Sequence, residues 1–181
     1  YLHGVLYFQE HQFDVSFEPY MAPPVVAFAA RRDPQERIWL VDYEGELQGT
    51  IAMVRETDDT ARLRWFLLAP PLRGRGLGRQ LVTAAVHFAQ DHDYQRIVLS
   101  TAGPLDPAKK LYTDAGFRCT QAKKQRIWGL DIALEDMGLG SVDELPPITL
   151  LYNTSEGHRR IAEAIRDQWS DLLGIEVQLT N

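Results

Sequence analysis

Hydrophobic residues that favour strands are concentrated in three runs within residues 37–68, and in the last run Leu63, Trp65 and Leu67 alternate with Arg62 and Arg64. The three apolar-rich runs are 37–43, 47–55 and 61–68. The sequence Glu44-Gly45-Glu46, between the first two runs, is typical of a hairpin turn. The pattern therefore predicts an antiparallel meander of three strands.

Helical spacing dominates on both sides of this meander. Leu77, Leu81, Ala85 and Phe88 recur every three or four residues, which predicts a helix directly after a glycine-rich stretch. Residues 5–30 predict two short helices, because prolines interrupt a hydrophobic run. The other expected elements are a strand at 96–100, a helix at 107–116, and strands at 117–121 and 126–132 joined by a basic turn at 122–125. This order predicts an α/β protein with a mixed sheet and helices on its faces.

The composition changes after Ile132. Residues 134–147 are acidic and rich in glycine and proline, so we predict a linker between a domain at 1–133 and a βαβ unit at 148–181. In that unit, Ser155 is the expected N-cap of a helix over 155–173 that ends at Gly174. The expected buried face of the helix consists of Ile161, Ile165, Trp169 and Leu172. A lone βαβ unit has too little core to fold alone, so we expect it to dock on another surface.

Composition and charge narrow the classes of function. The 181 residues carry a formal net charge of −6, which does not favour binding to nucleic acid or to an anionic membrane. No run approaches the roughly 18 apolar residues of a membrane span. A single cysteine, Cys119, excludes an internal disulfide and fits a reducing compartment, so we predict a cytoplasmic protein. Any anion must therefore be bound by a local site.

The sequence Arg73-Gly74-Arg75-Gly76-Leu77-Gly78 lies between a predicted strand and a predicted helix. This arrangement favours phosphate binding, because a helix N-terminus presents unpaired N–H groups and glycines let the backbone approach an anion. A Walker loop would need Lys followed by Ser or Thr, whereas Arg79-Gln80 follows the last glycine here. A dinucleotide-binding loop would need a different glycine spacing within a parallel βαβ unit.

The loop resembles the Gln/Arg-x-x-Gly-x-Gly/Ala signature of the GCN5-related N-acetyltransferases, the GNAT superfamily. The sequence "LYTDAGF", with Leu111, Tyr112, Gly116 and Phe117, resembles a second landmark of that family. The resemblance covers about residues 5–133 and implies a GNAT-like acyl-CoA acyltransferase fold, to which the βαβ unit is appended. It also implies acetyl-CoA as cosubstrate and an amine as acceptor; we predict no metal site.

Two finer resemblances extend this prediction. The sequences "HGVLYFQEHQFDVSFEPYMA" and "RIWGLDI" are similar to acetyltransferase domains attached to MarR-type regulators, although no winged-helix sequence is present and the family's first strand is not found. Residues 145–181 resemble part of an oligopeptide-binding protein of ABC transporters. Because those proteins are exported and acetyl-CoA is cytoplasmic, we predict a chimera. A strand of the tail could occupy the place of the missing first strand, or exchange between two copies in a homodimer.

The GNAT resemblance also assigns roles to individual residues. The cofactor-binding residues it implies are Phe66, Leu67, Leu68, Arg73, Gly74, Arg75, Gly76, Leu77, Gly78 and Arg79. Residues 66–68 would pair with the pantetheine arm, and the backbone of residues 73–78 would bind the pyrophosphate, with Arg75 or Arg79 adding charge. Tyr112 matches the general acid of the family; the alternative is an aromatic residue on the buried face of its helix.

Other candidate residues keep alternative interpretations. The general base could be Glu10, His11, Glu18 or a chain of waters. Trp65 and Trp128 could line an acceptor pocket or pack as core aromatics. Cys119 is expected to be a half-buried strand residue rather than a nucleophile.

Two functions follow from these patterns. The first is an N-acetyltransferase that transfers acetyl from acetyl-CoA to a primary amine of a small molecule or peptide by direct attack. The second is a non-catalytic acyl-CoA-binding protein or a purely structural chimera.

Overall fold

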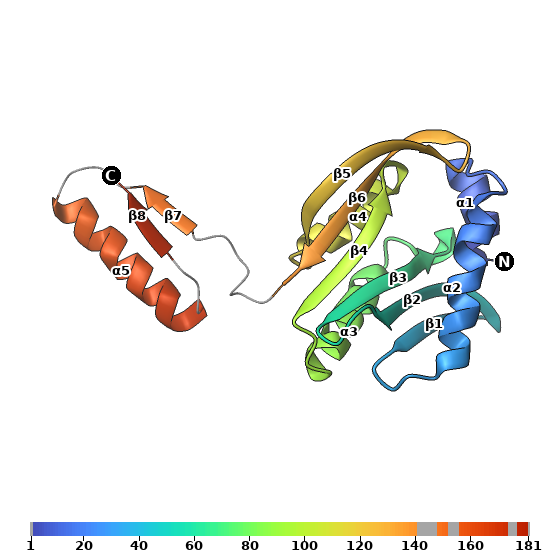
Figure 1. Ribbon diagram of the computed structural model, residues 1–181, viewed down its shortest axis with the longest axis horizontal. Coiled ribbons are helices and arrows are strands. Elements are labelled where there is room, and N and C mark those ends of the chain that lie inside the picture. The colour runs from blue at the N-terminus through green and yellow to red at the C-terminus, as the bar shows by residue number, and fades with distance from the viewer. Residues whose placement is uncertain (1, 141–147, 152–155, 174–176, 181) are drawn as a thin grey trace. The chain divides into compact units, whose positions relative to one another are not determined.

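The computed structural model describes residues 2–140, 148–151, 156–173 and 177–180 in two compact units, residues 1–139 and 140–181 (Figure 1). The first unit contains helices α1 (Leu2–His11), α2 (Phe17–Arg31), α3 (Leu77–Asp91) and α4 (Asp106–Asp114). Its strands are β1 (Arg37–Tyr43), β2 (Glu46–Arg55), β3 (Thr60–Leu68), β4 (Arg96–Ala102), β5 (Arg118–Ile127) and β6 (Leu130–Leu139). Two short 3-10 helices, η1 (Pro70–Leu72) and η2 (Gly103–Leu105), complete it.

The strands of the first unit form one mixed sheet in the order β1-β2-β3-β4-β6-β5. Only β3 and β4 are parallel; every other neighbouring pair is antiparallel. The α/β fold class with a mixed sheet is therefore confirmed. The meander is also as predicted, with Glu44 and Gly45 both at positive φ in the turn between β1 and β2.

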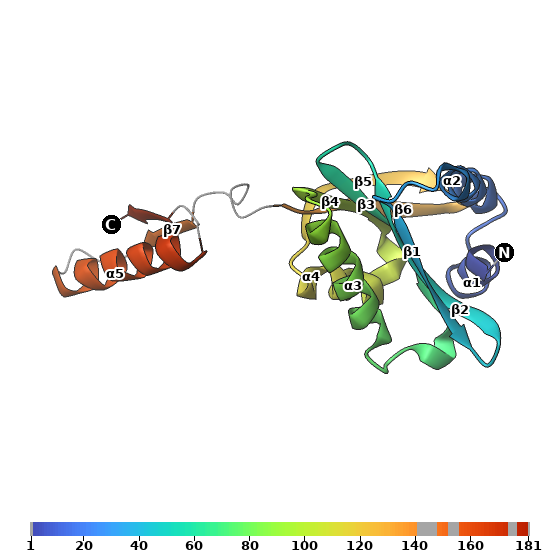
Figure 2. The same cartoon turned by 90° about the horizontal axis from the view of Figure 1, so that it is seen from below.

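Helices cover both faces of this sheet (Figure 2). Val82, Ala85 and Phe88 of α3 pack with Ile51 and Leu63 of the sheet in the main core. On the opposite face, Met21 and Phe28 of α2 pack against Trp65. Of the predicted stripe of α3, Ala85 and Phe88 are buried in the main core and Leu81 packs against it. Val82, which was not predicted, is buried beside them.

The sheet opens between its two parallel strands. β3 pairs with β4 only from Thr60 to Arg62, and beyond that point β3 continues along β2 while β4 continues along β6. The register of β2 and β3 also shifts between Thr50 and Ala52, where Trp65 adopts φ +52°. A bulky residue at positive φ is a strained conformation that often marks a functional site. This opening leaves one edge of β3, residues 63–68, without a strand partner among the described residues.

The last hairpin differs from the prediction. β5 runs without interruption from Arg118 to Ile127, through the residues 122–125 that we expected to turn. The turn lies instead at Trp128 and Gly129, which have φ +51° and +80°, the backbone required for a two-residue hairpin loop. β6 then pairs with β4 as far as Leu139, so residues 134–139, expected in the linker, belong to the sheet.

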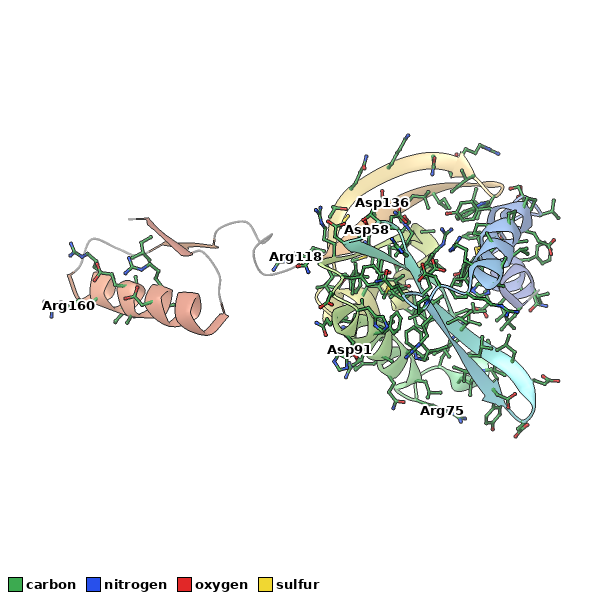
Figure 3. The ribbon with its side chains drawn as sticks, turned by 60° about the horizontal axis from the view of Figure 1, so that its bottom comes forward. Asp58, Arg75, Asp91, Arg118, Asp136 and Arg160 are labelled. Atoms are coloured by element: carbon green, nitrogen blue, oxygen red, sulfur yellow. The ribbon has the colours of Figure 1, made fainter. Side chains whose placement is uncertain are left out.

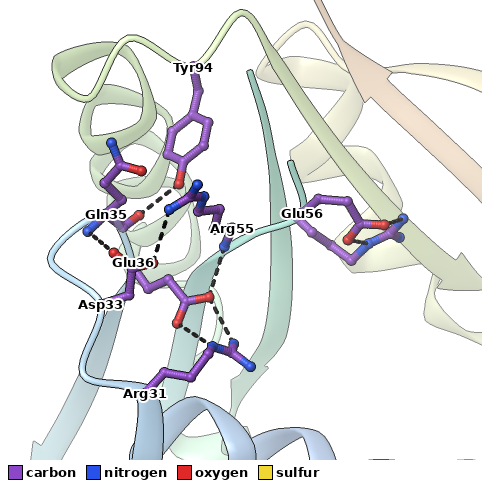
Figure 4. Close-up of polar contacts among 8 residues, drawn as sticks. Arg31, Asp33, Gln35, Glu36, Arg55, Glu56 and Tyr94 are labelled. Atoms are coloured by element: carbon purple, nitrogen blue, oxygen red, sulfur yellow. Dashed lines mark hydrogen bonds and ion pairs between the residues drawn. The ribbon is translucent and has the colours of Figure 1, made fainter. Parts of the chain in front are cut away.

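The N-terminal region forms two helices, but not for the expected reason. The chain breaks between α1 and α2 at residues 12–16, and α2 continues through Pro23 and Pro24. After α2, the buried carboxylate of Glu36 accepts two hydrogen bonds from Arg31 and one from the backbone N–H of Arg55 (Figure 4). These bonds join the end of α2 to β2.

The second unit consists of β7 (Ile148–Leu151), α5 (Glu156–Leu173) and β8 (Val177–Thr180). β7 and β8 pair in parallel with each other in a sheet of their own, so neither fills the expected position in the larger sheet. Ile161 was expected on the buried face of the helix but is 57% exposed, whereas Ala162 is 3% exposed. Ser155 and Gly174, and the side chains of Trp169 and Leu172, lie outside the described residues.

Candidate active site

The glycine-rich loop presents a row of free backbone donors. Gly74 and Gly76 have φ +72° and +80°, and α3 begins immediately afterwards at Leu77. None of the described residues accepts a hydrogen bond from the backbone N–H groups of residues 74–79. Such a row of donors at the positive end of a helix dipole is suited to a phosphate or pyrophosphate group.

Close packing holds the start of α3 against the end of β3. A Cβ added at Gly78 would lie 2.8 Å from Cδ1 of Leu111 and 3.4 Å from Cζ of Phe66. The absence of a side chain at Gly78 therefore lets α3, α4 and β3 approach one another. As a result, the free donors of the loop lie beside the unpaired edge of β3.

The arginines of the loop differ in how they are engaged. Arg73 makes a bidentate ion pair with Glu10 of α1, at 2.6 and 3.0 Å, and its Nε donates to the carbonyl of Leu68 at 2.7 Å. Nη2 of Arg79 lies 3.8 Å from Oδ2 of Asp114. Arg75 is exposed and makes no ion pair with a described residue, and Figure 3 shows it at the periphery of the unit. Arg75 is thus free to reach a bound anion, while Arg73 fixes the loop to α1.

A cavity of about 760 Å³ opens beside this loop. It is lined by parts of α1, α2, β3, β4 and α4 and by the glycine loop. The predicted cofactor-binding residues that line it are Phe66, Leu67, Leu68, Arg73, Gly74, Gly76, Gly78 and Arg79. Arg75 and Leu77 do not line it; Leu77 is the first residue of α3.

Tyr112 lines the same cavity from α4. Its side chain packs edge-to-face on Phe66, with ring centroids 5.9 Å apart, and the residue is 6% exposed. Burial raises the pKa of Tyr112 far above its ordinary value, and the nearby phenol of Tyr7 raises it further. The side chain is therefore a neutral hydroxyl that can donate a hydrogen bond, and it is also part of the core.

One face of α1 contributes residues that the sequence analysis did not identify. His3 and Tyr7 line the cavity beside the expected candidates Glu10 and His11, and these four positions repeat at helical spacing. Burial raises the pKa of Tyr7 to about 12 and lowers that of His3 to about 4. Burial also lowers the pKa of His11. The spacing of His3, Tyr7 and His11 by four residues is the pattern in the sequence that could have identified this face of α1.

The candidates for a general base are placed differently. His11 lines the cavity and is neutral at pH 7. Glu10 also lines it, but its carboxylate is engaged by Arg73. Glu18 is exposed and does not line the cavity. The arrangement favours a histidine of α1 over a carboxylate.

Both candidate tryptophans line the cavity as well as packing in the protein. Trp128 lies 4.9 Å from Phe13, 5.0 Å from Phe17 and 5.2 Å from Tyr20, measured between ring centroids. Trp65 packs edge-to-face with Phe28 at 5.3 Å. The two interpretations, pocket wall and core aromatic, hold together.

Other features of the described residues bear on the chemistry. Cys119, expected to be half-buried, is exposed on β5. No group of three His, Cys, Asp or Glu side chains in the described ranges could hold a metal ion. Of the helices that the structure describes, none has the length and apolar character needed to cross a bilayer.

Comparison with known proteins finds similarity both to N-acetyltransferases and to an oligopeptide-binding protein, the two kinds of protein that the sequence resembles. The chain is 31% identical over 87 residues to the uncharacterized N-acetyltransferase YjgM of Escherichia coli, covering 46% of this chain and 52% of that protein. It is 42% identical over 52 residues to the oligopeptide-binding protein OppA of Bacillus subtilis, covering 29% of this chain and 10% of that protein. The chain therefore spans about half or less of these relatives.

The fold of the first unit is shared with solved acetyltransferases. A GNAT family acetyltransferase from Elizabethkingia anophelis, solved with acetyl-CoA bound, superposes with a TM-score of 0.52 at 20% identity. The superposition covers 66% of this chain and 86% of that one. Residues 4–117, well over half of the chain, match the Acetyltransferase (GNAT) family. The chain therefore belongs to the GNAT family of acetyltransferases.

Proposed function

We propose that this chain is an acetyl-CoA-dependent N-acetyltransferase that acetylates a primary amine by direct attack on the thioester. The free N–H groups of residues 74–79 carry the proposal, because they lie beside an unpaired strand edge and a cavity that contains Tyr112. A pyrophosphate is the kind of anion that such donors bind. The pantetheine arm would extend the sheet along the free edge of β3.

The residues of the cavity suit the chemistry of acetyl transfer. A backbone N–H near the end of β3 would donate to the carbonyl oxygen as negative charge develops on it. A neutral histidine of α1, His11 or His3, would accept a hydrogen bond from the amine and help it to lose a proton. Tyr112 would donate to the sulfur as the C–S bond breaks.

A non-catalytic acyl-CoA-binding protein differs from this proposal only in turnover, whereas a purely structural chimera would differ also in not binding acetyl-CoA. A scaffold or structural chimera would keep the loop without needing a buried hydroxyl in the cavity. A chimeric origin is supported by the division into two units and by the likeness to both YjgM and OppA. The association with MarR-type regulators, the cytoplasmic location and the homodimer stay predictions.

Calorimetric titration of acetyl-CoA into the full chain tests the loop. We compare the parent with Gly76→Ala and with Gly45→Ala, since both glycines have φ +80° and no atom within 4 Å of an added Cβ. The two substitutions impose similar backbone strain, about 1 kcal/mol, but only Gly76 belongs to the loop. We expect micromolar binding by the parent and by Gly45→Ala, and at least tenfold weaker binding by Gly76→Ala.

Release of free CoA in the presence of acceptor amines then distinguishes an enzyme from a scaffold. Binding without turnover on any amine would support the non-catalytic alternative. If the parent did not bind acetyl-CoA, or if Gly45→Ala weakened binding as much as Gly76→Ala, the assignment of the loop would be wrong.

A further inference from the structure

The charged residues of the cavity are not all paired. Its lining includes Arg62, Arg64, Arg73 and Arg79. Arg62 is paired with Glu56 at 2.6 Å, Arg73 with Glu10 at 2.6 Å and Arg79 more loosely with Asp114 at 3.8 Å. Arg64 makes no ion pair with a described residue; its charge only adds to that of Arg62 in lowering the pKa of Glu56.

Arg64 lies away from the phosphate-binding loop. It precedes Leu68 on β3 by four residues, which is at most roughly 13 Å in an extended strand and somewhat less across the bulge at Trp65. Its guanidinium lies over the indole of Trp65, 5.5 Å from the ring centroid. This cation–π contact holds the planar group at the wall of the cavity while leaving its N–H donors available. Arg64 is therefore poorly placed for the pyrophosphate and well placed for a second bound group.

Two buried side-chain nitrogens of residues that line the cavity also lack partners among the described residues. Nε1 of Trp65 and Nε2 of His3 are buried and make no hydrogen bond with a described residue. Both residues line the cavity, and an indole N–H can only donate. Such a donor is costly to leave unpaired, but both nitrogens are closed to solvent, so the binding of a ligand does not depend on a contact with either.

The acidic residues of the cavity point to the kind of ligand that Arg64 would bind. Glu10 is the only acidic residue that lines it within the described part of the chain, and Arg73 occupies its carboxylate. A ligand with only positive charge would thus meet a free arginine and no free carboxylate. A ligand that also carries a carboxylate would neutralise Arg64 through a bidentate contact.

We infer that the amine acceptor is an amino acid, whose carboxylate binds Arg64 while its amine faces the thioester beside residues 66–68. This inference rests on the proposed function and adds the class of acceptor. Phe66 follows Arg64 by two residues, roughly 7 Å along the strand. The amine and the carboxylate of an amino acid are attached to one carbon. Together with the long side chain of Arg64, such a molecule is long enough to cover the distance from Arg64 to Phe66.

The transfer is balanced without any further reactant. The ammonium group loses one proton, and its nitrogen lone pair forms the new C–N bond to the acetyl carbon. The C–S bond breaks and leaves its electron pair on sulfur, which takes a proton from Tyr112. The nitrogen loses its second proton, which restores Tyr112, and the products are the N-acetyl amino acid, CoA and one released proton.

The test compares acceptors that differ only in the carboxylate. The full chain is incubated with acetyl-CoA and either the twenty L-amino acids or their carboxamides, and the acetylated products are quantified by mass spectrometry. We expect initial rates about 10- to 100-fold higher for the acids, the range typical of a charge-assisted hydrogen bond. Arg64→Gln should reduce this preference to about threefold or less by raising KM for the acids.

Arg37→Gln is the matched control. Arg37 also packs on aromatic rings without an ion pair among the described residues, 4.6 Å from the Phe88 centroid, but it does not line the cavity. Arg37→Gln should keep the parent's preference for acids over carboxamides. Arg64→Lys should show more of this preference than Arg64→Gln. Acetyl-CoA binding is measured for every variant by calorimetry.

The outcomes separate the two proposals. Equal rates for acids and carboxamides, no acetylation of either mixture by a protein that binds acetyl-CoA, or an unchanged preference in Arg64→Gln would each overturn the inference. The inference would also be overturned if the main effect of Arg64→Gln were weaker binding of acetyl-CoA, because Arg64 would then bind the cosubstrate. Failure of the parent to bind acetyl-CoA would overturn the proposed function, and this inference with it.

Discussion

Burial determines the protonation states of the side chains that face one another across the cavity. Desolvation raises the pKa of Tyr7 and of Tyr112 and lowers that of His3 and of His11, because it disfavours every charged form. At neutral pH, two phenols and two neutral imidazoles therefore line a site whose charge comes from arginines. This combination offers the reacting groups both a hydrogen-bond donor and a hydrogen-bond acceptor.

Tyr112→Phe should separate catalysis from folding. Removing only the hydroxyl should lower kcat by about 10- to 100-fold, because proton donation to sulfur is lost. The dissociation constant of acetyl-CoA should stay within about twofold, since the ring still packs on Phe66. Steady-state kinetics of CoA release and calorimetry measure the two effects.

Tyr94→Phe is the matched control for that substitution. Tyr94 is also buried, but its hydroxyl donates to the carbonyl of Gln35 at 3.0 Å, outside the cavity (Figure 4). This variant should lose about 1 kcal/mol of stability and keep its kcat. Full activity of Tyr112→Phe would argue that Tyr112 is only a core aromatic.

His3 should make stability depend on pH in a defined window. Its pKa is about 4 in the folded protein and near 6.5 when exposed, so the unfolded state binds more protons between these values. Stability is therefore lost as the pH falls from 6.5 to 4, by about 3 kcal/mol for this residue. Urea unfolding followed by tryptophan fluorescence should show a shallower pH dependence for His3→Gln than for the parent. His87→Gln, at an exposed position of α3, serves as control; equal slopes for His3→Gln and the parent would contradict the burial of His3.

At the scale of elements, the site depends on the divergence of β3 from β4. The bulge at Trp65, stabilised by a hydrogen bond of 2.5 Å from Thr50 Oγ1 to the Trp65 carbonyl, turns the end of β3. Gly78 brings α3 against that end, and the Glu10–Arg73 pair joins the loop to α1. The end of β3, the start of α3 and the distant helix α1 thus meet at one free strand edge.

Gly49→Ala should disturb this arrangement from the neighbouring strand. An added Cβ would lie 2.6 Å from Cδ2 of Leu68, 3.0 Å from the carbonyl oxygen of Leu67 and 3.2 Å from Cβ of Val41. Because backbone cannot yield as a side-chain end can, we expect a loss of about 1–3 kcal/mol of stability and weaker acetyl-CoA binding. Thermal unfolding and calorimetry measure these losses.

Gly138→Ala is the corresponding control on β6. Its added Cβ would meet nothing closer than 3.5 Å, an ordinary contact. It should change the unfolding temperature much less than Gly49→Ala. Similar effects of the two substitutions would contradict the close approach of β2 to the end of β3.

At the scale of the whole molecule, the described residues that line the cavity all belong to the first unit and precede Leu139. A chain that ends at Leu139 should therefore fold cooperatively and bind acetyl-CoA as the full chain does. A chain that ends at residue 133 should be strongly destabilised, because it loses the pairing of residues 134–139 with β4 and β5. Circular dichroism melts and calorimetry compare the two; equal stability of both would show that this part of β6 is dispensable.

Local sequence patterns were sufficient to predict those elements whose structure depends mainly on their own residues. Strand-favouring residues around a hairpin turn predicted β1 and β2, and alternation predicted β3. Helical spacing predicted α3, and the loop motif predicted where free donors would follow a strand. The turn of the last hairpin was missed, because Trp128 is not a residue that usually favours positive φ. The prolines of α2 were misinterpreted, because packing against the sheet can outweigh local propensity.

The sequence by itself determined the family, the order of the elements and the glycine loop, because each of these is encoded in residues close together along the chain. Only the tertiary structure decided which face of α1 enters the cavity, which arginines are paired, and where the sheet opens. These features depend on contacts between segments far apart in sequence, such as Glu10 with Arg73 and Trp65 with Thr50. Burial by those contacts, rather than residue type, makes His3 neutral and keeps Tyr112 protonated.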